Sequence, residues 1–295
     1  MKSEAICSGE FVTVGGINLH YVSAGGGRPV VLIHGNPGSH QDYKMAVLDK
    51  LSRSFHAIAF DRPGHGCSER HDSGEGNVEA QARFIRDALR ELSIRKPILV
   101  GHSWGGSLVL AAAVAYAEEL SGIVLLAPAA YPSVRVEWWS RLPHVPVIGD
   151  FMIHTLTPLI GPAIVRISLK EAYHPQPVQQ EYAEQSAEMW TTPERVRACA
   201  YDERTLRSSL RTLSASYSAI ELPVVIVTGS ADLLLEPHKH AYQLHNTIRG
   251  SELVVLPKTG HQLPQTRPDS VIDAVKTVWR AVDARSTQLS RQRSN

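Results

Sequence analysis

The segment Pro97-Ile-Leu-Val-Gly-His-Ser-Trp-Gly-Gly-Ser107 decides the fold, because it joins an apolar run to a helical pattern through a glycine-rich turn. The apolar residues predict a buried strand, and residues 107–117 predict a helix. Ser103 lies in the turn, at the centre of a G-x-S-x-G pattern. A sharp strand-to-helix turn strains the backbone, and the flanking glycines leave room for it. The segment therefore predicts a serine hydroxyl raised above a sheet edge, with the backbone N–H of Trp104 at a helix N-terminus beside it.

Apolar runs on both sides of this segment extend the pattern. Buried or half-buried strands are predicted at residues 11–14, 17–22, 29–33, 55–60, 97–100, 122–127, 223–228 and 253–256. Helical patterns are predicted at residues 42–51, 77–92, 107–117, 237–246 and 268–282. Strands that alternate with amphipathic helices favour a parallel sheet covered on both faces. We therefore expect an α/β fold with a mostly parallel, eight-stranded sheet, and a site at the carboxyl ends of its strands.

The alternation stops between residues 131 and 221, which carry many prolines and no strong strand signal. Helices are predicted there at residues 179–190 and 193–213. The simplest interpretation is a helical cap at 131–221, inserted into a core made of residues 1–130 and 222–283. The polar tail at 284–295 is predicted to be disordered. The longest apolar run, residues 151–164, is interrupted by Pro158, Gly161 and Pro162, so no membrane span is expected.

The composition excludes several classes of protein. A net charge of +1, without a dense basic cluster, argues against nucleic-acid binding. The apolar content of 43% is typical of a globular enzyme with a large core. Cys7, Cys67 and Cys199 are scattered and odd in number, which is typical of a reducing cytoplasm rather than of a disulfide framework. We therefore expect a cytoplasmic protein whose Cys67 and Cys199 are inert, and residues 1–10 do not have the apolar core of a signal peptide.

Two further residues complete a possible catalytic set with Ser103. A serine hydroxyl needs a base to take its proton and an acid to orient that base. Asp232 follows the predicted strand 223–228, and His261 follows the strand 253–256. Each therefore lies just beyond the carboxyl end of a parallel strand, as Ser103 does. The sequence predicts that the three side chains meet at one edge of the sheet.

Together these motifs resemble the α/β-hydrolase superfamily, in its cap-bearing members, over about residues 11–282. The matching stretches are His34-Gly35 with Pro37-Gly38, Asp61-Arg-Pro-Gly-His-Gly-Cys-Ser68, Gly101-His-Ser-Trp-Gly105, Gly229-Ser-Ala-Asp232 and Gly260-His261. The resemblance implies that Ser103 is the nucleophile, His261 the general base and Asp232 the orienting acid. It also implies an oxyanion hole formed by the backbone N–H groups of Asn36 and Trp104.

Asn36 and Trp104 are also similar to the halide-holding Asn and Trp of haloalkane dehalogenases. Those enzymes and epoxide hydrolases use an aspartate nucleophile, whereas this chain has Ser103, which suits acyl transfer at a carbonyl. The run from Ser103 to Gly106 is similar to proline iminopeptidases, which usually have glycine where Asn36 stands. The same motifs fit carboxylesterases, lactonases and C–C bond hydrolases.

We therefore expect a serine hydrolase that cleaves an ester or related acyl bond of a small, fairly apolar substrate, without cofactor or metal. The alternatives are a C–C bond hydrolase or an aminopeptidase that uses the same residues, and a low-turnover receptor with a hydrolase fold. Asp61 is interpreted as a brace for its loop, and His34 and His102 as structural or pocket-lining. His238 and His240 are spaced like metal ligands, but on a helix they would point to different faces. The sequence does not indicate an oligomeric state.

Overall fold

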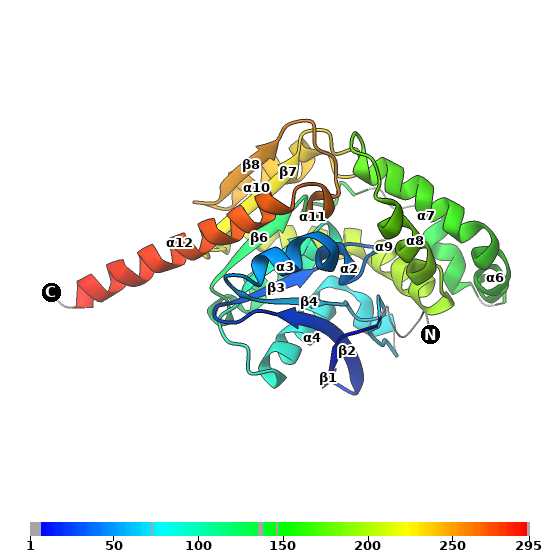
Figure 1. Ribbon diagram of the computed structural model, residues 1–295, viewed down its shortest axis with the longest axis horizontal. Coiled ribbons are helices and arrows are strands. Elements are labelled where there is room, and N and C mark those ends of the chain that lie inside the picture. The colour runs from blue at the N-terminus through cyan, green and yellow to red at the C-terminus, as the bar shows by residue number, and fades with distance from the viewer. Residues whose placement is uncertain (1–6, 72, 135–137, 146, 294–295) are drawn as a thin grey trace.

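A single sheet, seen near the centre of Figure 1, organises the structure, a computed structural model that describes residues 7–71, 73–134, 138–145 and 147–293. Its strands are β1 (Glu10–Val14), β2 (Ile17–Ala24), β3 (Pro29–Ile33), β4 (His56–Phe60), β5 (Ile98–His102), β6 (Gly122–Leu126), β7 (Val224–Gly229) and β8 (Glu252–Leu256). Their order is β1-β2-β4-β3-β5-β6-β7-β8. The β1–β2 and β2–β4 pairs are antiparallel, and the other pairs are parallel. The predicted mostly parallel, eight-stranded sheet is confirmed.

Helices cover both faces of the sheet, as a parallel sheet requires. The flanking elements are α2 (Gln41–Tyr43), the π-helical η1 (Lys44–Leu48), α3 (Asp49–Leu51), η2 (Ser73–Gly76), α4 (Val78–Glu91), α5 (Trp104–Ala115), η3 (Ala117–Glu119), η7 (Pro237–Lys239), α10 (Ala241–Thr247), α11 (Leu263–Thr266) and α12 (Pro268–Arg293). Helices α4, α5 and α10 share one apolar layer with the sheet, and η1 and α12 share the other. Residues of β5 and β6 are buried along their whole length. The site at the end of β5 therefore rests on a rigid base.

Between β6 and β7 the described chain forms helices and loops. We call residues 138–145 and 147–219 the helical insertion. It contains η4 (Trp138–His144), α6 (Ile148–Phe151), the π-helical η5 (Met152–Leu156), α7 (Thr157–Tyr173), α8 (Gln180–Trp190), α9 (Pro193–Leu213) and η6 (Ser214–Ala219). Helices α6 to α9 form the right-hand part of the molecule in Figure 1. The prediction that residues 131–221 form a separate cap stays a prediction here, and residues 135–137 and 146 lie outside the described part.

A buried ionic network joins the insertion to the sheet. Asp202 of α9 accepts hydrogen bonds from Arg62 (2.6 Å), Arg70 (2.8 Å), His65 (2.9 Å) and Gln81 (3.1 Å). Burial raises the pKa of Asp202, but the guanidinium groups of Arg70 and Arg62 outweigh it, and the pKa is lowered. Burial and the charge of Arg62 lower the pKa of His65 to about 4, so His65 donates as a neutral ring. An ionised, fully paired Asp202 thus holds α9 against the loop after β4.

A second junction centres on a buried carboxyl group that titrates near neutral pH. Tyr182 of α8 donates its hydroxyl hydrogen to Asp42 of α2 (2.8 Å) and accepts from Gln262 (2.9 Å). Burial raises the pKa of Asp42 to about 7, although the hydrogen bond from Tyr182 lowers it. Near neutral pH, Asp42 is therefore divided between its protonated and ionised forms, in contrast to Asp202.

The prediction that prolines interrupt the apolar run of the insertion is wrong. Elements α6, η5 and α7 form one helical segment from Ile148 to Tyr173. Pro158 lies where the π-helical η5 passes into α7, and Pro162 lies inside α7, so this segment continues past two residues that have no N–H to donate. By length and composition this segment could cross a membrane, and 17% of its most apolar window is buried. One such helix is weak evidence for a span.

The predicted disordered tail is also wrong as far as Arg293, because α12 continues to that residue. Residues 284–293 contain three Arg, two Gln, one Ala and one Leu, which have high helix propensity, so they extend the preceding helix even though the segment is polar. Residues 294–295 lie outside the described part of the chain.

Candidate active site

Ser103 lies alone between β5 and α5, in the strained conformation that the sequence predicted. Its φ of 54° and ψ of −119° are rare for a residue with a side chain. A Cβ atom at Gly101 would lie 2.4 Å from the carbonyl oxygen of Gly105, and one at Gly105 would lie 2.4 Å from that of His34. These close approaches explain why the turn needs glycine on both sides of Ser103.

His261 and Asp232 form a hydrogen-bonded pair at the same edge of the sheet. His261 Nδ1 lies 2.7 Å from Asp232 Oδ2, and Asp232 Oδ1 accepts the N–H groups of Leu234 and Leu235 at 2.9 Å each. Burial raises the pKa of Asp232, but His261 and these N–H groups favour the carboxylate, so the pKa is lowered. A carboxylate at Nδ1 fixes the tautomer in which Nε2 is free to accept a proton.

A cavity of about 320 Å³ brings Ser103 and His261 together with Asn36 and Trp104. The carboxyl ends of β5 and β8 carry the first two residues to this cavity. Ser103 Oγ has no hydrogen-bond partner among the described residues, so no bond yet joins it to His261. In enzymes without substrate such bonds are often long, and they tighten in the reacting complex.

The backbone N–H groups of Asn36 and Trp104 are available for a negative charge in this cavity. Neither N–H takes part in a backbone hydrogen bond among the described residues. Trp104 is the first residue of α5, so its N–H lies at the N-terminus of that helix. Arg62 supports the loop of Asn36, because its guanidinium donates to the carbonyl oxygens of Gly35 (2.7 Å) and His34 (3.2 Å). The same guanidinium also donates to Asp202 of α9, so Arg62 holds both the insertion and the loop of Asn36.

The side chains of Asn36 and Trp104, in contrast, are already engaged. Asn36 Nδ2 donates to the carbonyl oxygen of Cys199 (3.0 Å), and Trp104 Nε1 donates to that of Asp202 (3.3 Å). Both carbonyl groups belong to α9. The two side-chain N–H groups that resemble a halide clamp are therefore occupied by the insertion.

His102 supports the loop of His261. Its Nε2 donates to the carbonyl oxygen of His261 (3.0 Å), and the two rings lie 4.8 Å apart. Burial and the nearby His261 lower the pKa of His102 to about 3, so the ring is neutral. This agrees with the interpretation of His102 as a structural, pocket-lining residue.

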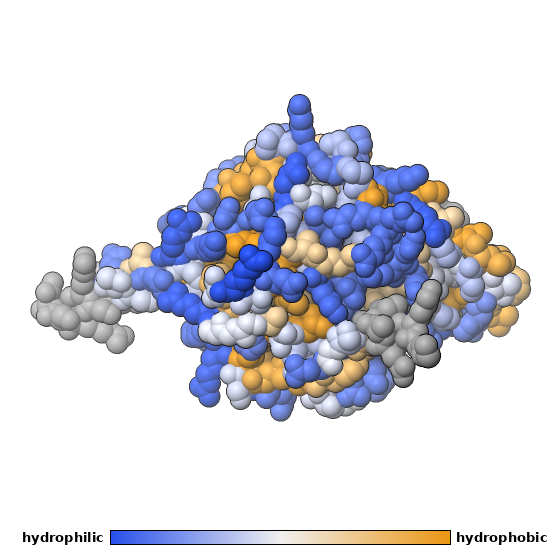
Figure 2. Space-filling model, viewed as in Figure 1, coloured by the Kyte–Doolittle hydropathy of each residue, from blue (hydrophilic) through white to orange (hydrophobic). Residues whose placement is uncertain are grey.

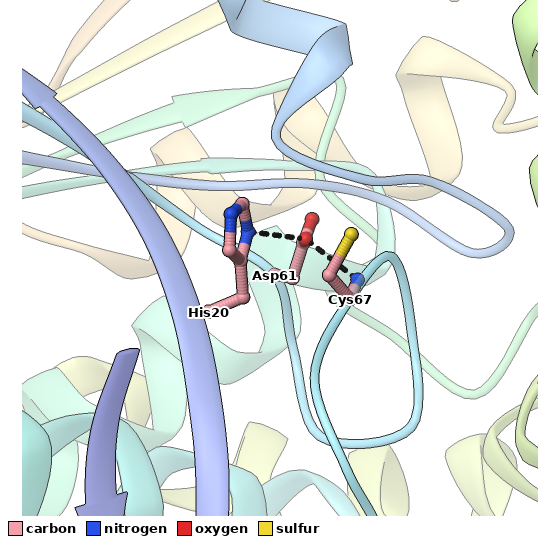
Figure 3. Close-up of side chains that lie close together, drawn as sticks. All are labelled: His20, Asp61 and Cys67. Atoms are coloured by element: carbon pink, nitrogen blue, oxygen red, sulfur yellow. Dashed lines mark hydrogen bonds and ion pairs between the residues drawn. The ribbon is translucent and has the colours of Figure 1, made fainter. Parts of the chain in front are cut away.

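Asp61 braces its loop, as predicted. It accepts hydrogen bonds from His20 Nδ1 (2.8 Å), from His40 Nδ1 (3.0 Å) and from the backbone N–H of Cys67 (2.8 Å). Figure 3 shows His20 and Cys67 on either side of this carboxylate. The three residues have potential metal-ligand atoms within 4.8 Å of one another, but the sulfur of Cys67 is bonded to Cys7. The cluster therefore works as a brace, and it lacks a thiolate for a metal.

The disulfide between Cys7 and Cys67 overturns the expectation that Cys67 is inert. Cys7 precedes β1 and Cys67 follows β4, and both strands pair with β2. Sheet order thus brings together two cysteines separated by 60 residues, which spacing along the sequence could not reveal. Disulfides persist in oxidising compartments, so cysteine usage no longer supports a cytoplasmic location.

Asp202 is the residue at this site that the sequence analysis missed. A signal for it exists, because Ala198, Asp202, Leu206 and Leu210 recur every four residues along α9 and are all buried. A charged residue within an otherwise apolar stripe predicts a buried ionic partner.

The alpha/beta hydrolase family model matches residues 30–274, so the chain belongs to this family. An uncharacterized protein of Mycobacterium tuberculosis is 29% identical, over 90% of this chain and 80% of that protein. Haloalkane dehalogenase 2 of the same species is 26% identical, over 87% of this chain and 90% of that enzyme. A thermophilic esterase from Thermogutta terrifontis has a similar fold, with a TM-score of 0.72 and 24% identity over 92% of this chain and 99% of that one. The chain is thus an enzyme of the hydrolase class.

Proposed function

We propose that this hydrolase cleaves an ester or a related acyl bond of a small, fairly apolar substrate through an acyl-enzyme intermediate on Ser103. The observation that carries the proposal is the Asp232–His261 pair, which faces the same cavity as a strained Ser103. The insertion, taken as residues 131–221, would act as the cap of a core made of residues 1–130 and 222–283. The reaction uses side chains and backbone groups of this chain and needs no cofactor.

The proposed reaction has two halves. His261 Nε2 takes the proton of Ser103, whose Oγ forms a bond to the substrate carbonyl carbon. The oxyanion rests on the N–H groups of Asn36 and Trp104. When it collapses, the bond to the leaving group breaks and His261 gives that group its proton. Water then gives a proton to His261 and attacks the acyl carbon, and Ser103 regains its proton as the acid departs.

Two observations argue against dehalogenation and epoxide opening, which some relatives perform. Both reactions need a carboxylate that attacks saturated carbon, and this chain has Ser103 at that position. In addition, α9 accepts hydrogen bonds from Trp104 Nε1 and from Asn36 Nδ2, so the indole N–H and one of the two amide hydrogens are already used, which weakens this pair as a halide site.

An aminopeptidase on the same residues is the second candidate, because acidic groups also line the cavity. Glu171 and Glu203 lie among apolar residues such as Trp190 and Leu206. A carboxylate in such a position could bind the amino group of an aminoacyl substrate. Preference for aminoacyl anilides over simple esters would support this candidate, and preference for a vinylogous diketone would support a C–C bond hydrolase.

A short p-nitrophenyl ester tests the proposal. We expect Ser103→Ala and His261→Ala to lower kcat by about 10⁴-fold or more. The exposed Ser208 and His238 provide matched controls, because Ser208→Ala and His238→Ala keep wild-type turnover. Equal turnover by all the variants would exclude the proposed nucleophile and base. Tight binding of a small ligand without turnover of any substrate class would instead favour a receptor.

A further inference from the structure

Exposed apolar side chains gather on one part of the helical insertion. Of the thirteen large hydrophobic side chains exposed on the described molecule, nine lie between residues 145 and 167. They are Val145, Val147, Ile148, Phe151, Leu156, Leu159, Ile160, Ile164 and Ile167, and we call them the apolar stripe. Figure 2 shows hydrophobic surface at the end of the molecule where Figure 1 places α6 and α7. Exposed patches of this kind mark interaction sites.

Helix α7 has exposed apolar residues along one side, and residues that line the cavity lie on another part of its surface. Leu156, Ile160, Ile164 and Ile167 recur at intervals of three and four residues, so they share the outer face. Leu169 and Ala172 line the catalytic cavity from another side of the helix, and the exposed Ser168, one turn after Ile164, lines it where the two sides meet. The outer face of the helix that borders the cavity is therefore apolar and unpartnered.

The end of α7 is tied to the catalytic loop. The carbonyl oxygen of Ala172 accepts the backbone N–H groups of His261 (3.0 Å) and Gln262 (3.1 Å). A helix that crossed a bilayer would have to break these bonds and leave the cavity. This attachment favours a helix that lies on a surface over one that spans it.

The charges around the apolar stripe are mainly cationic. The chain has no acidic residue between Asp150 and Glu171, and Asp150 is paired with Arg197. Arg166 lies between Ile164 and Ile167 and Lys170 follows the stripe, and both are exposed and have no ion-pair partner among the described residues. An apolar face bordered by free cations complements an anionic lipid surface.

The apolar stripe also leads to the mouth of the cavity. Exposed residues of the cavity lining include Ser168, Glu171, Leu233 and Leu234, and they mark where the cavity opens. Ile164 and Ile167 precede Ser168 by about one turn or less on the same helix. Leu233 is 57% exposed and continues the apolar surface on the other side of the opening.

We propose that the apolar stripe docks α6 and α7 onto an anionic lipid surface and turns the mouth of the cavity toward that surface. A second copy of the chain fits this face less well, because a twofold contact would bring the cations of the two copies close together. Docking depends on the apolar stripe and the cations beside it, and not on Ser103 or His261, so it stands independently of the reaction proposed above.

Co-sedimentation of the full chain with vesicles tests the proposal. With an equal mixture of phosphatidylcholine and phosphatidylglycerol, we expect wild-type protein to pellet with the vesicles. Leu159→Ser together with Ile167→Ser should weaken binding by about tenfold or more, because two large side chains no longer enter the lipid. Phe11→Ser, which changes an exposed side chain on β1, is the matched control and should bind as wild type.

A charge variant separates the electrostatic part of binding. Arg166→Gln together with Lys170→Gln should weaken binding to the anionic vesicles by about tenfold and leave binding to pure phosphatidylcholine unchanged. All variants should hydrolyse a dissolved p-nitrophenyl ester like the wild type, which shows that their fold is intact.

Three outcomes would overturn the proposal. In the first, wild type fails to pellet, or the serine variant pellets equally well. In the second, wild type is a dimer in solution that the serine variant dissociates, which would make a second copy the occupant. In the third, an alkaline carbonate wash leaves the protein in the vesicle pellet, which would indicate a spanning helix rather than a docked one.

Discussion

The sheet core and the helical insertion differ in how their apolar surface is covered. Strands β5 and β6 are buried on both faces, whereas α7 is covered on its cavity side and bare on its outer side. The core holds Ser103, Asp232 and His261, while the insertion contributes Leu169, Trp190 and Leu206 to the cavity wall. From this contrast we propose that the core fixes the chemistry and that the insertion controls which molecules reach it.

The two regions meet through polar groups rather than through apolar packing alone. Asp202 joins α9 to the core as a buried ion, and Asp42 joins α2 to α8 through a carboxyl group whose pKa is raised to about 7. Substitutions in the core should therefore affect the reaction most, and substitutions at the junctions should affect stability. The predictions below test this division, beginning with the largest expected effect.

Asp232→Asn tests whether the core alone sets the chemistry. The amide cannot hold His261 in the tautomer that accepts a proton, so kcat for an ester should fall by about 10⁴-fold, which corresponds to about 5.5 kcal/mol of barrier. Thermal unfolding should change little. Asp273→Asn, on the exposed side of α12, is the control and should keep full activity. A loss smaller than about tenfold would remove Asp232 from the mechanism.

Asp202→Asn tests the ionic junction. It leaves Arg62 and Arg70 buried without their counter-ion, so the free energy of unfolding should fall by about 3–5 kcal/mol in urea titrations. Asp150→Asn removes the exposed ion pair with Arg197 in the same insertion, and should cost about 0–1 kcal/mol. A similar loss of unfolding free energy in Asp202→Asn and Asp150→Asn would show that the buried ion pairs of Asp202 stabilise the fold no more than the exposed pair of Asp150.

Loss of the disulfide tests how much the link between the segment before β1 and the loop after β4 stabilises the core. Replacing Cys7 and Cys67 together with serine opens a loop of about 60 residues and should destabilise the fold by about 2–4 kcal/mol, with little effect on kcat.

Burial, aided by the nearby Glu203, raises the pKa of the free Cys199 to about 12, so the native protein should resist alkylation at that thiol. Rapid alkylation of Cys199 at neutral pH would contradict this raised pKa.

Asp42→Asn tests the junction between α2 and α8 through the pH dependence of stability. Burial raises the pKa of Asp42 to about 7, so the folded protein keeps a proton that the unfolded chain loses near pH 4. Stability should therefore fall as pH rises through this window, by about 2–3 kcal/mol between about pH 5 and pH 8. An amide side chain at this position has no such proton, so Asp42→Asn should remove this slope, and the exposed Asp49→Asn should retain it. An unchanged slope in Asp42→Asn would assign the effect to another group.

The core was predictable from sequence because its strands are continuous apolar runs and its motifs come in a fixed order. Ser103, Asp232 and His261 each follow such a run, so their common edge could be inferred from parallel pairing alone. The insertion was less predictable. Pro158 and Pro162 predict an interruption, but the helix continues through both residues. The apolar residues of the outer face of α7 are typical of a buried core, although they are exposed.

Long-range partners were the least predictable part of the molecule. The bond between Cys7 and Cys67 depends on β1 and β4 both pairing with β2, and Asp202 meets Arg62 only when α9 lies over the loop after β4. The repeat of buried residues along α9 marks Asp202 as a buried acid, but local sequence does not identify Arg62 as its partner or Cys67 as the partner of Cys7. Local periodicity reveals which residues are buried, and tertiary structure decides which partners they meet.

Mass spectrometry after reaction with a fluorophosphonate tests most directly whether the core activates Ser103. The wild-type chain should gain one phosphonyl group, mapped to Ser103, and His261→Ala should gain it far more slowly. An adduct on a different residue, or equal labelling with and without the imidazole, would contradict the account.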